Sequence, residues 1–256
     1  MDLGLQDRVY VVGGGSKGLG RAVAGALVAE GARVLLVSRD EGELAQAVAE
    51  LGQRARSVAV DVADPSAAET IGAAVDREFG RLDGVLVNAG GPPPGEALAL
   101  TDEQWRQSYE LLLGGPLRLL RTLVPKMDNG GAILFITSSS VRQPIPNLDT
   151  SNVLRPGVAA LAKVLAQELG PKIRVNSIGP GRFDTGRVRS LDQQRAQSQG
   201  ITVDEQRERM SKTIPLRRYG EPEELGRFAA FLLSPAASYI SGVAAMADGA
   251  MVSALP

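Results

Sequence analysis

Residues 8–38 read RVYVVGGGSKGLGRAVAGALVAEGARVLLVS, and this stretch decides the fold. A short apolar run rich in β-branched residues leads directly into a glycine-rich turn. Apolar residues at helical spacing then fill 21–30, Gly31 ends that helix, and 33–38 form a second apolar strand. A glycine turn between a strand and a helix, within a unit of about 30 residues, indicates a dinucleotide-binding site.

Three glycines of this turn, Gly14, Gly18 and Gly20, leave the backbone without side chains. A pyrophosphate can therefore approach the main chain, with its charge facing the helix N-terminus. The alternative is a glycine-rich surface turn that binds nothing, which leaves the surrounding strand–helix–strand order unexplained.

Composition limits the number of domains, the binding partners and the catalytic chemistry that we expect. A chain of 256 residues, 44% of them hydrophobic, is long enough for one α/β domain with a full core. The net charge of −1 favours neither nucleic acid nor an anionic membrane as a partner. Without Cys or His, the usual zinc ligands, a thiol nucleophile and a histidine base are all absent, so no metal is expected.

Strand and helix patterns continue to alternate along the whole chain. We expect a single domain over residues 1–256, with a Rossmann-type, doubly wound parallel sheet flanked by helices on both faces and a ligand crevice at the carboxyl ends of the strands. The expected strands after the opening unit are 57–62, 84–87, 132–138, 173–178 and 239–250, and the expected helices are 41–51, 67–79, 102–123, 151–169 and 221–234. Thr101 and Gln104 form a candidate capping box at the start of the long helix.

The sequence predicts neither a signal peptide nor a membrane span. The first residues form no signal peptide, and no apolar run approaches the ~20 residues of a membrane span. We therefore expect a cytoplasmic protein.

The spacing of Gly14, Gly18 and Gly20 resembles that of the short-chain dehydrogenase/reductase family, and further matches extend over nearly the whole chain. Asn-Ala-Gly follows the fourth strand, Pro-Gly the sixth, and an acidic–apolar pair the third. Gly13 departs from the family's usual Thr, and Ala250 from its usual second C-terminal Gly. The resemblance implies that the nucleotide is bound by Gly14, Ser16, Lys17, Gly18, Leu19, Gly20, Ser38, Arg39, Asp61, Val62, Asn88, Ala89, Gly90, Arg155, Pro180, Gly181 and Thr185.

The resemblance also assigns particular tasks to some of these residues. The amide of Asn88 ties neighbouring strands together, Asp61 and Val62 line the adenine pocket, and Thr185 contacts the nicotinamide carboxamide.

The end of the second strand bears on which nucleotide is bound. A carboxylate there would bind the ribose hydroxyls of NAD, whereas Arg favours the 2′-phosphate of NADP. Ser38 ends the strand, Arg39 follows it, and Lys17 lies in the glycine loop, so we expect NADP(H). Asp40 favours NAD(H) but lies outside the strand.

The catalytic positions depart from the family. Its pattern is a Ser at the end of the fifth strand, a Tyr 13 residues later and a Lys four beyond, and these positions hold Ser138, Ser151 and Arg155. A serine hydroxyl is shorter and a far weaker acid than a phenol, and Arg does not give up its proton. The family's helix Asn is replaced by Leu112. Losing a positioned general acid typically costs ~100- to 10,000-fold in rate.

Other residues near the catalytic positions bear on the missing proton donor and on the start of the helix. Asp149 is a replacement acid or, with Thr150 and Asn152, a helix cap, and the cap is the better explanation. Pro156 favours a helix that begins later than in relatives, which would shift Ser151 and Arg155. Tyr109 either points at the cavity or serves packing or a subunit interface.

A polar insertion over 186–213, with helical spacing at 203–210, is predicted to be a mobile substrate lid. Arg182, Arg187 and Arg189 either attract a phosphate or an acidic carrier protein, or form a solvated face.

Two functions stay open. One is an NADP(H)-dependent oxidoreductase similar to the 3-oxoacyl-carrier-protein reductases, acting on a small or carrier-bound carbonyl compound with an atypical active site, and forming a homodimer or homotetramer as the family usually does. The other is an NADP(H)-binding protein with little or no turnover, serving as a sensor or assembly partner.

Overall fold

The structure, a computed structural model, describes residues 2–254, apart from the side chains of residues 128 and 129. The described chain forms one parallel sheet of seven strands in the order β3-β2-β1-β4-β5-β6-β7. The strands are β1 Val9–Gly13, β2 Arg33–Ser38, β3 Ala55–Ala59, β4 Leu82–Val87, β5 Met127–Ile136, β6 Ile173–Pro180 and β7 Ala244–Ala247. The strand order reverses between β1 and β4, which confirms the predicted doubly wound fold and locates its ligand crevice.

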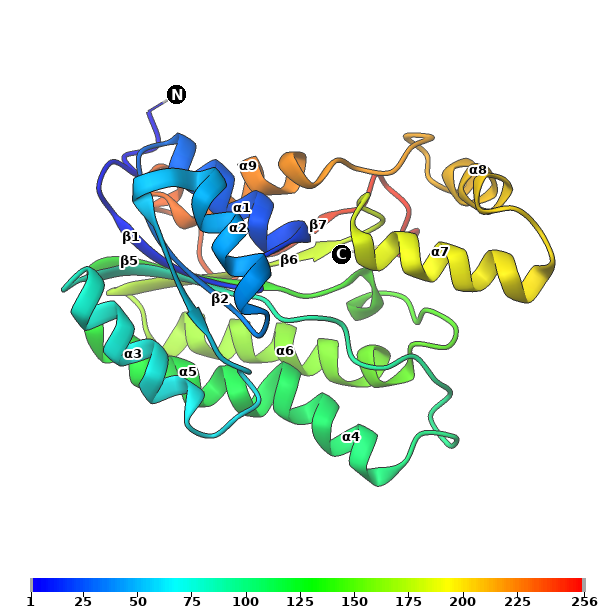
Figure 1. The fold of residues 1–256 in the computed structure, drawn as a ribbon, viewed down its shortest axis with the longest axis horizontal. Helices are drawn as coiled ribbons and strands as arrows, with labels where there is room; N and C mark the ends of the chain where they lie inside the picture. The colour runs from blue at the N-terminus through cyan, green and yellow to red at the C-terminus, as the bar shows by residue number, and fades with distance from the viewer. Residues whose placement is uncertain (1, 255–256) are drawn as a thin grey trace.

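Helices cover both faces of the sheet, with α1, α2 and α9 on one side and α3, α5 and α6 on the other (Figure 1). Each face of the sheet has its own hydrophobic core, and alternate residues of a strand belong to opposite cores. In β1, Tyr10 and Val12 pack with α1 and α9, and Val9 and Val11 pack with α3, α5 and α6. The helices are α1 Gly18–Ala29, α2 Glu41–Leu51, α3 Ala67–Glu78, α4 Asp102–Tyr109, α5 Gly115–Leu123, α6 Asp149–Glu168, α7 Gly186–Gln199, α8 Val203–Thr213 and α9 Pro222–Leu233.

Two strands are shorter than the sequence patterns predict. β3 ends at Ala59, so Asp61 and Val62 lie beyond it, although the Val60 N–H still donates to Ser38 O at 2.9 Å. β7 covers only Ala244–Ala247 instead of 239–250, because Gly242 and Gly249 take positive φ values of 77° and 65° that break an extended strand.

The predicted long helix over 102–123 is continuous but not uniform. The Thr101–Gln104 capping box is present at its start. A π-helical turn over Glu110–Gly114 then separates α4 from α5. At the following residue, Gly115, an added Cβ would lie 2.1 Å from Val62 O, so a glycine is needed where the helix contacts the segment after β3.

Helix α6 begins at Asp149, and Pro156 lies inside it, so the predicted late start is wrong. Side chains of the first turn bind neighbouring loops and fix the start. Asp149 accepts from the Ala97 N–H at 2.9 Å and Thr150 donates to Pro93 O at 3.2 Å. Asn152 bonds to both main-chain groups of Ile145.

These contacts also correct the expected capping role of the three side chains. Leu148 occupies the N-cap position without a side-chain hydrogen bond, while Asp149, Thr150 and Asn152 bind loops instead of capping α6. In the described part of the chain, no helix has the length and apolar character needed to cross a membrane.

Candidate active site

The glycine loop after β1 is shaped by close backbone contacts. Gly14 and Gly18 have positive φ values of 60° and 58°. A Cβ added to Gly20 would lie 2.2 Å from Gly14 O, and one added to Gly14 would lie 2.6 Å from the Asn88 amide nitrogen. Side chains at these positions would therefore clash with the loop itself, so its geometry depends on glycine.

The end of β4 is bonded to this loop, as the sequence predicts. The Asn88 side-chain amide donates to Gly13 O at 3.0 Å. A Cβ at Gly13 would approach Asn88 O to 2.5 Å, so the backbone leaves no room for a side chain at this position. The two strands on either side of the switch point are thus held together where the crevice opens.

Two helix N-termini converge at this crevice. Lys17 is the N-cap of α1 and makes no side-chain capping bond, so its side chain satisfies no N–H group of the first turn. The Thr185 hydroxyl accepts from the Val188 N–H and caps α7. A Cβ on Gly18 would face Thr185 Cγ2 at 3.7 Å, and Gly90 borders open space. Free N–H groups and a side-chain-free floor make a cradle suited to an anion such as a pyrophosphate.

Polar and charged side chains gather at the end of β2. Ser16 Oγ lies 3.0 Å from Ser38 Oγ and 3.1 Å from a Glu43 oxygen, and Lys17 pairs with Glu43 at 2.6 Å. Arg39 pairs with Asp61 at 3.6 Å. The Lys17 and Arg39 side chains are about three-quarters exposed, at 75% and 76%, so both can turn toward a phosphate.

Asp40, which favours NAD(H) in the sequence, has a structural task. Its carboxylate accepts from the Glu43 N–H at 2.8 Å and caps α2. Glu43 itself was missed by sequence reasoning, because no motif links it to Ser16 and Lys17. Val62, Asn88 and Ala89 line a small apolar cavity together with Val11 and Val37, whereas Asp61, predicted with Val62 to line the adenine pocket, does not line it.

The three predicted catalytic positions meet at the end of β5. Ser138 Oγ accepts from the Ser140 N–H at 3.0 Å, and Ser140 Oγ lies 3.3 Å from Ser151 Oγ. Ser140 and Ser151 are buried. Ser140 was also missed, although the run Ser138–Ser140 was visible in the sequence. The Ser140 and Ser151 hydroxyls are therefore within hydrogen-bond distance of each other, and the Ser140 N–H joins Ser138 to this pair.

Arg155 follows Ser151 by one turn of α6. Its Nη1 donates to Ile136 O at 2.5 Å, its Nε has no hydrogen-bond partner, and the residue is only 8% exposed. Burial lowers the pKa of Arg155 to about 10, so the group still carries its charge at neutral pH. Within residues 2–254, Arg155 has no carboxylate partner.

Three other residues stand at or near the catalytic positions in the sequence, and none of them is placed as a proton donor. Tyr109 is 45% exposed on α4, which favours a surface contact, the second of its two predicted roles, over a place in the cavity. Leu112 is buried in the core formed by α3, α5 and α6. The two oxygens of Asp149 accept from the Ala97 N–H and the Asn152 amide, which ties a loop to α6.

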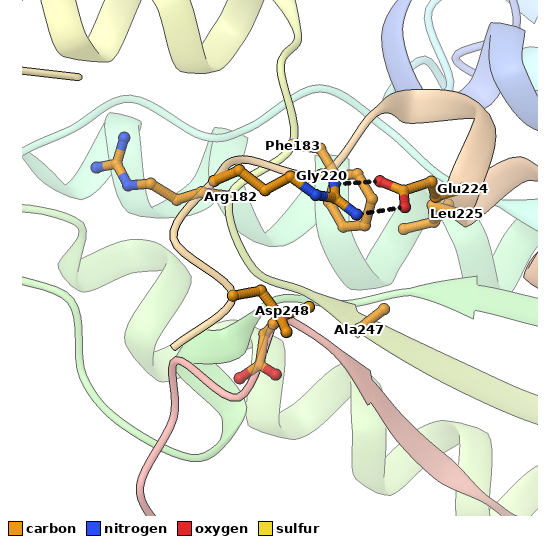
Figure 2. A pocket seen from close by; sticks show the side chains of 10 residues that line it. Arg182, Phe183, Gly220, Glu224, Leu225, Ala247 and Asp248 are labelled. Atoms are coloured by element: carbon orange, nitrogen blue, oxygen red, sulfur yellow. Dashed lines mark hydrogen bonds and ion pairs between the residues drawn. The ribbon is translucent and has the colours of Figure 1, made fainter. Parts of the chain in front are cut away.

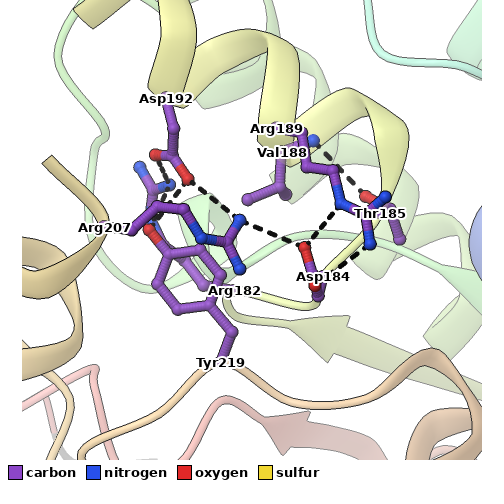
Figure 3. Close-up of polar contacts among 8 residues, drawn as sticks. All are labelled: Arg182, Asp184, Thr185, Val188, Arg189, Asp192, Arg207 and Tyr219. Carbon is purple, nitrogen blue, oxygen red and sulfur yellow. Dashed lines mark hydrogen bonds and ion pairs between the residues drawn. The ribbon is translucent and has the colours of Figure 1, made fainter. Parts of the chain in front are cut away.

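The segment predicted to be a lid forms the two helices α7 and α8, and a buried carboxylate on α7 binds residues outside it (Figure 3). Asp192 is fully buried and accepts from Arg182 at 2.6 Å and from the Tyr219 hydroxyl at 2.9 Å. The Arg207 guanidinium lies over the Tyr219 ring, 4.7 Å from its centroid. This network connects α7, α8 and the segment before α9.

A second carboxylate, Asp184, extends the network toward Thr185. Arg189 binds it through two hydrogen bonds of 2.9 and 3.1 Å, and Arg207 through one of 3.1 Å. These bonds hold the pKa of Asp184 below its ordinary value, the Arg189 bond most strongly. Arg182 and Arg189 are thus paired with acids, whereas Arg187 donates to the main-chain oxygen of Pro92.

A cavity of about 160 Å³ lies behind the turn that follows β6 (Figure 2). Arg218 and Glu224 bind each other across it through two hydrogen bonds, and Asp248 accepts from two main-chain N–H groups. The charged groups of these three side chains are therefore already engaged within the chain. The described residues also contain no cluster of acidic side chains that could hold a metal ion.

Comparison with known proteins agrees with this geometry. A family model described as Enoyl-(Acyl carrier protein) reductase matches residues 14–251. Dehydrogenase/reductase SDR family member 4 of Homo sapiens is 31% identical over 264 residues, which cover 98% of this chain and 90% of that one. The chain belongs to the short-chain dehydrogenase/reductase family.

Other members of the family are similar over the same length. The 3-oxoacyl-[acyl-carrier-protein] reductase FabG of Escherichia coli is 29% identical over 253 residues, covering 97% of this chain and 99% of that one. The crystal structure of L-sorbose reductase from Gluconobacter frateurii, complexed with NADPH and L-sorbose, superposes with a TM-score of 0.95 at 34% identity and covers 100% of both chains. These family relatives are named as reductases, and they support an oxidoreductase.

Proposed function

We propose that this chain is an NADP(H)-dependent oxidoreductase that reduces a carbonyl compound through an atypical active site. The observation that carries the proposal is the cradle between the N-termini of α1 and α7, whose shape depends on Gly14, Gly18 and Gly20. A similar fold in a reductase solved with NADPH supports it.

The residues present fit such a nucleotide. The cradle would hold the pyrophosphate, Thr185 with Pro180 and Gly181 would border the nicotinamide, and Val62 would contact the adenine. Lys17 and Arg39, both exposed at the end of β2, would pair with a 2′-phosphate, and the capping role of Asp40 removes the main argument for NAD(H). When bound, NADPH would supply the hydride.

At the carbonyl oxygen, the chain offers hydroxyls and one cation. Ser138 and Ser151 would donate hydrogen bonds, and Ser140, 3.3 Å from Ser151, would connect them. The positive charge of Arg155 would stabilise the negative charge that develops on the oxygen. Since an aliphatic hydroxyl is a weak acid, Ser151 would pass on a proton from water, and turnover would be slower than with a positioned phenol by ~100-fold or more.

One observation favours the alternative of binding without turnover. The hydroxyl of Ser151 lies within hydrogen-bond distance of another serine, and neither Asp149 nor Tyr109 takes over as an acid. In that case the chain would be a nucleotide-dependent sensor or assembly partner. Either role agrees with a homodimer or homotetramer, and exposed apolar residues such as Tyr109 and Val153 on α4 and α6 support self-association.

The test combines NADPH binding with NADPH consumption over a panel of aldehydes and ketones, with purified protein. Binding together with substrate-dependent consumption supports the oxidoreductase. Binding without consumption for any compound supports the sensor, and absence of NADPH binding contradicts both.

A further inference from the structure

Glu43 lies in the first turn of α2, but its side chain does not cap that helix. Three other helices carry a Gln or Glu at the same third position, and each closes a capping box with the residue before the helix: Gln104 in α4, Glu205 in α8 and Glu224 in α9. At α2, Asp40 accepts from the Glu43 N–H, but within residues 2–254 the Glu43 carboxylate returns no bond to the Asp40 N–H. The Glu43 side chain therefore serves another contact.

Both carboxylate oxygens of Glu43 bind the glycine loop instead. One accepts from Lys17 Nζ at 2.6 Å, and the other lies 3.1 Å from Ser16 Oγ. Ser16 Oγ in turn lies 3.0 Å from Ser38 Oγ at the end of β2. Ser16, Lys17 and Ser38 are all predicted to contact the nucleotide, so Glu43 joins α2 to the place proposed for the 2′-phosphate.

The positive charges at this end of the crevice are already paired. Lys17 binds Glu43, and Arg39 pairs with Asp61 at the longer distance of 3.6 Å. A 2′-phosphate that binds Lys17 would therefore take the place of the Glu43 carboxylate or lie beside it. Phosphate and carboxylate repel each other, whereas the uncharged 2′-hydroxyl of NADH brings no such repulsion.

A carboxylate next to Lys17 has two opposite effects, and exposure decides which is larger. It orients the ammonium for the phosphate, and it repels the phosphate. The Lys17 and Glu43 side chains are 75% and 35% exposed, and an ion pair this exposed contributes little to holding a side chain in place. The negative charge of Glu43 stays beside the site after Lys17 turns to the phosphate, so repulsion is the larger effect.

We infer that Glu43 is a specificity-determining residue that limits the preference of this chain for NADPH over NADH, by opposing the 2′-phosphate at Lys17. This inference rests on the proposed function and adds the residue that tunes its choice of nucleotide. Without nucleotide, Lys17 binds Glu43; with NADPH, it binds the 2′-phosphate against the repulsion of the carboxylate. NADH requires no such exchange, so its affinity does not depend on the charge of Glu43.

The test is a calorimetric titration of two variants and the wild type with NADPH and with NADH. Glu43→Gln removes the charge and keeps the size of the side chain, so NADPH should bind about tenfold more tightly and NADH equally well. Glu50→Gln is the matched control, with both affinities unchanged. It removes a carboxylate that pairs with Arg21 on the same helix, about 10 Å further along, where salt screens it from the site.

The salt dependence identifies the cause of the gain. Because salt screens charges at the surface, the gain in NADPH affinity from Glu43→Gln should shrink when the titrations are repeated at about 0.5 M NaCl. A gain that does not change with salt would mean that the substitution acts through the shape of the glycine loop, and it would contradict the inference.

The titrations also separate this inference from the proposed function. If the wild type binds NADPH but Glu43→Gln behaves like Glu50→Gln, or binds NADPH more weakly than the wild type, the role inferred for Glu43 is wrong and the proposed function stands. If the wild type does not bind NADPH, the proposed function is wrong and this inference fails with it.

Discussion

The glycine loop between β1 and α1 and the first turns of α6 form the two ends of the crevice, and they differ in what determines their structure. At β1 and α1, positions are determined by backbone packing: a Cβ at Gly20 would lie 2.2 Å from Gly14 O. At α6, the proposed chemistry would depend on two buried side chains, Ser151 and Arg155, of one helix. If both proposed roles hold, replacing those two side chains would leave the backbone of the glycine loop in place, so proton transfer would change while nucleotide binding stays the same.

The largest effect is expected from restoring the family's side chains at α6. Ser151→Tyr together with Arg155→Lys should raise carbonyl reduction about 100-fold, because a phenol next to an ammonium is a far better proton donor than a serine. The measurement is kcat/KM for the best carbonyl substrate, with NADPH affinity as the control. Unchanged rates at unchanged NADPH affinity would show that pocket shape, not the missing acid, limits the reaction.

A smaller effect is expected at the nucleotide end. Gly18→Ala should weaken NADPH binding about 30-fold, or roughly 2 kcal/mol, because the added methyl group enters the cradle that faces Thr185. Gly80→Ala is the matched control, since Gly80 has a similar positive φ of 67° with nothing within 4 Å.

Both variants should lose about 1–2 kcal/mol of unfolding free energy from backbone strain. Calorimetric titration and urea unfolding separate the two effects. Equal NADPH affinities in the two variants would mean that the cradle does not bind the nucleotide.

Nucleotide preference should shift by about tenfold. Arg39→Gln removes a cation at the end of β2, so NADPH should bind about tenfold more weakly while NADH binding stays the same, since only NADPH carries the 2′-phosphate. The ratio of the two dissociation constants is the measurement. A parallel loss for both nucleotides would place Arg39 elsewhere than at the 2′-phosphate.

The smallest effect on nucleotide binding is expected from the lid. Tyr219→Phe removes the hydroxyl that donates to buried Asp192 and should cost about 1–2 kcal/mol of unfolding free energy. Burial raises the pKa of Tyr219 to about 12, so the hydroxyl is a donor at neutral pH. NADPH affinity should change less than about threefold.

Tyr239→Phe is the control for this change, because the Tyr239 side chain is fully exposed. Urea denaturation should show no loss for Tyr239→Phe. Equal stability of the two variants would mean that the Asp192 network does not hold the lid in place.

The sequence predicts one end of the crevice better than the other, for a physical reason. The glycine loop and the Asn88 contact follow from local backbone requirements that a short motif expresses fully. The start of α6 was mispredicted because proline chemistry favours a later start, while the contacts that fix it come from loops about 50 residues away, such as Ala97. Likewise, Asp192 and Tyr219 are far apart in sequence and carry no motif.

The most direct test of the central claim is a calorimetric titration of the wild-type protein with NADPH and NADH. If the glycine cradle and the cations at β2 have kept their function despite the loss of the phenol and the ammonium, NADPH should bind with a dissociation constant in the micromolar range, tighter than NADH. Absence of saturable NADPH binding at about 1 mM would contradict the account.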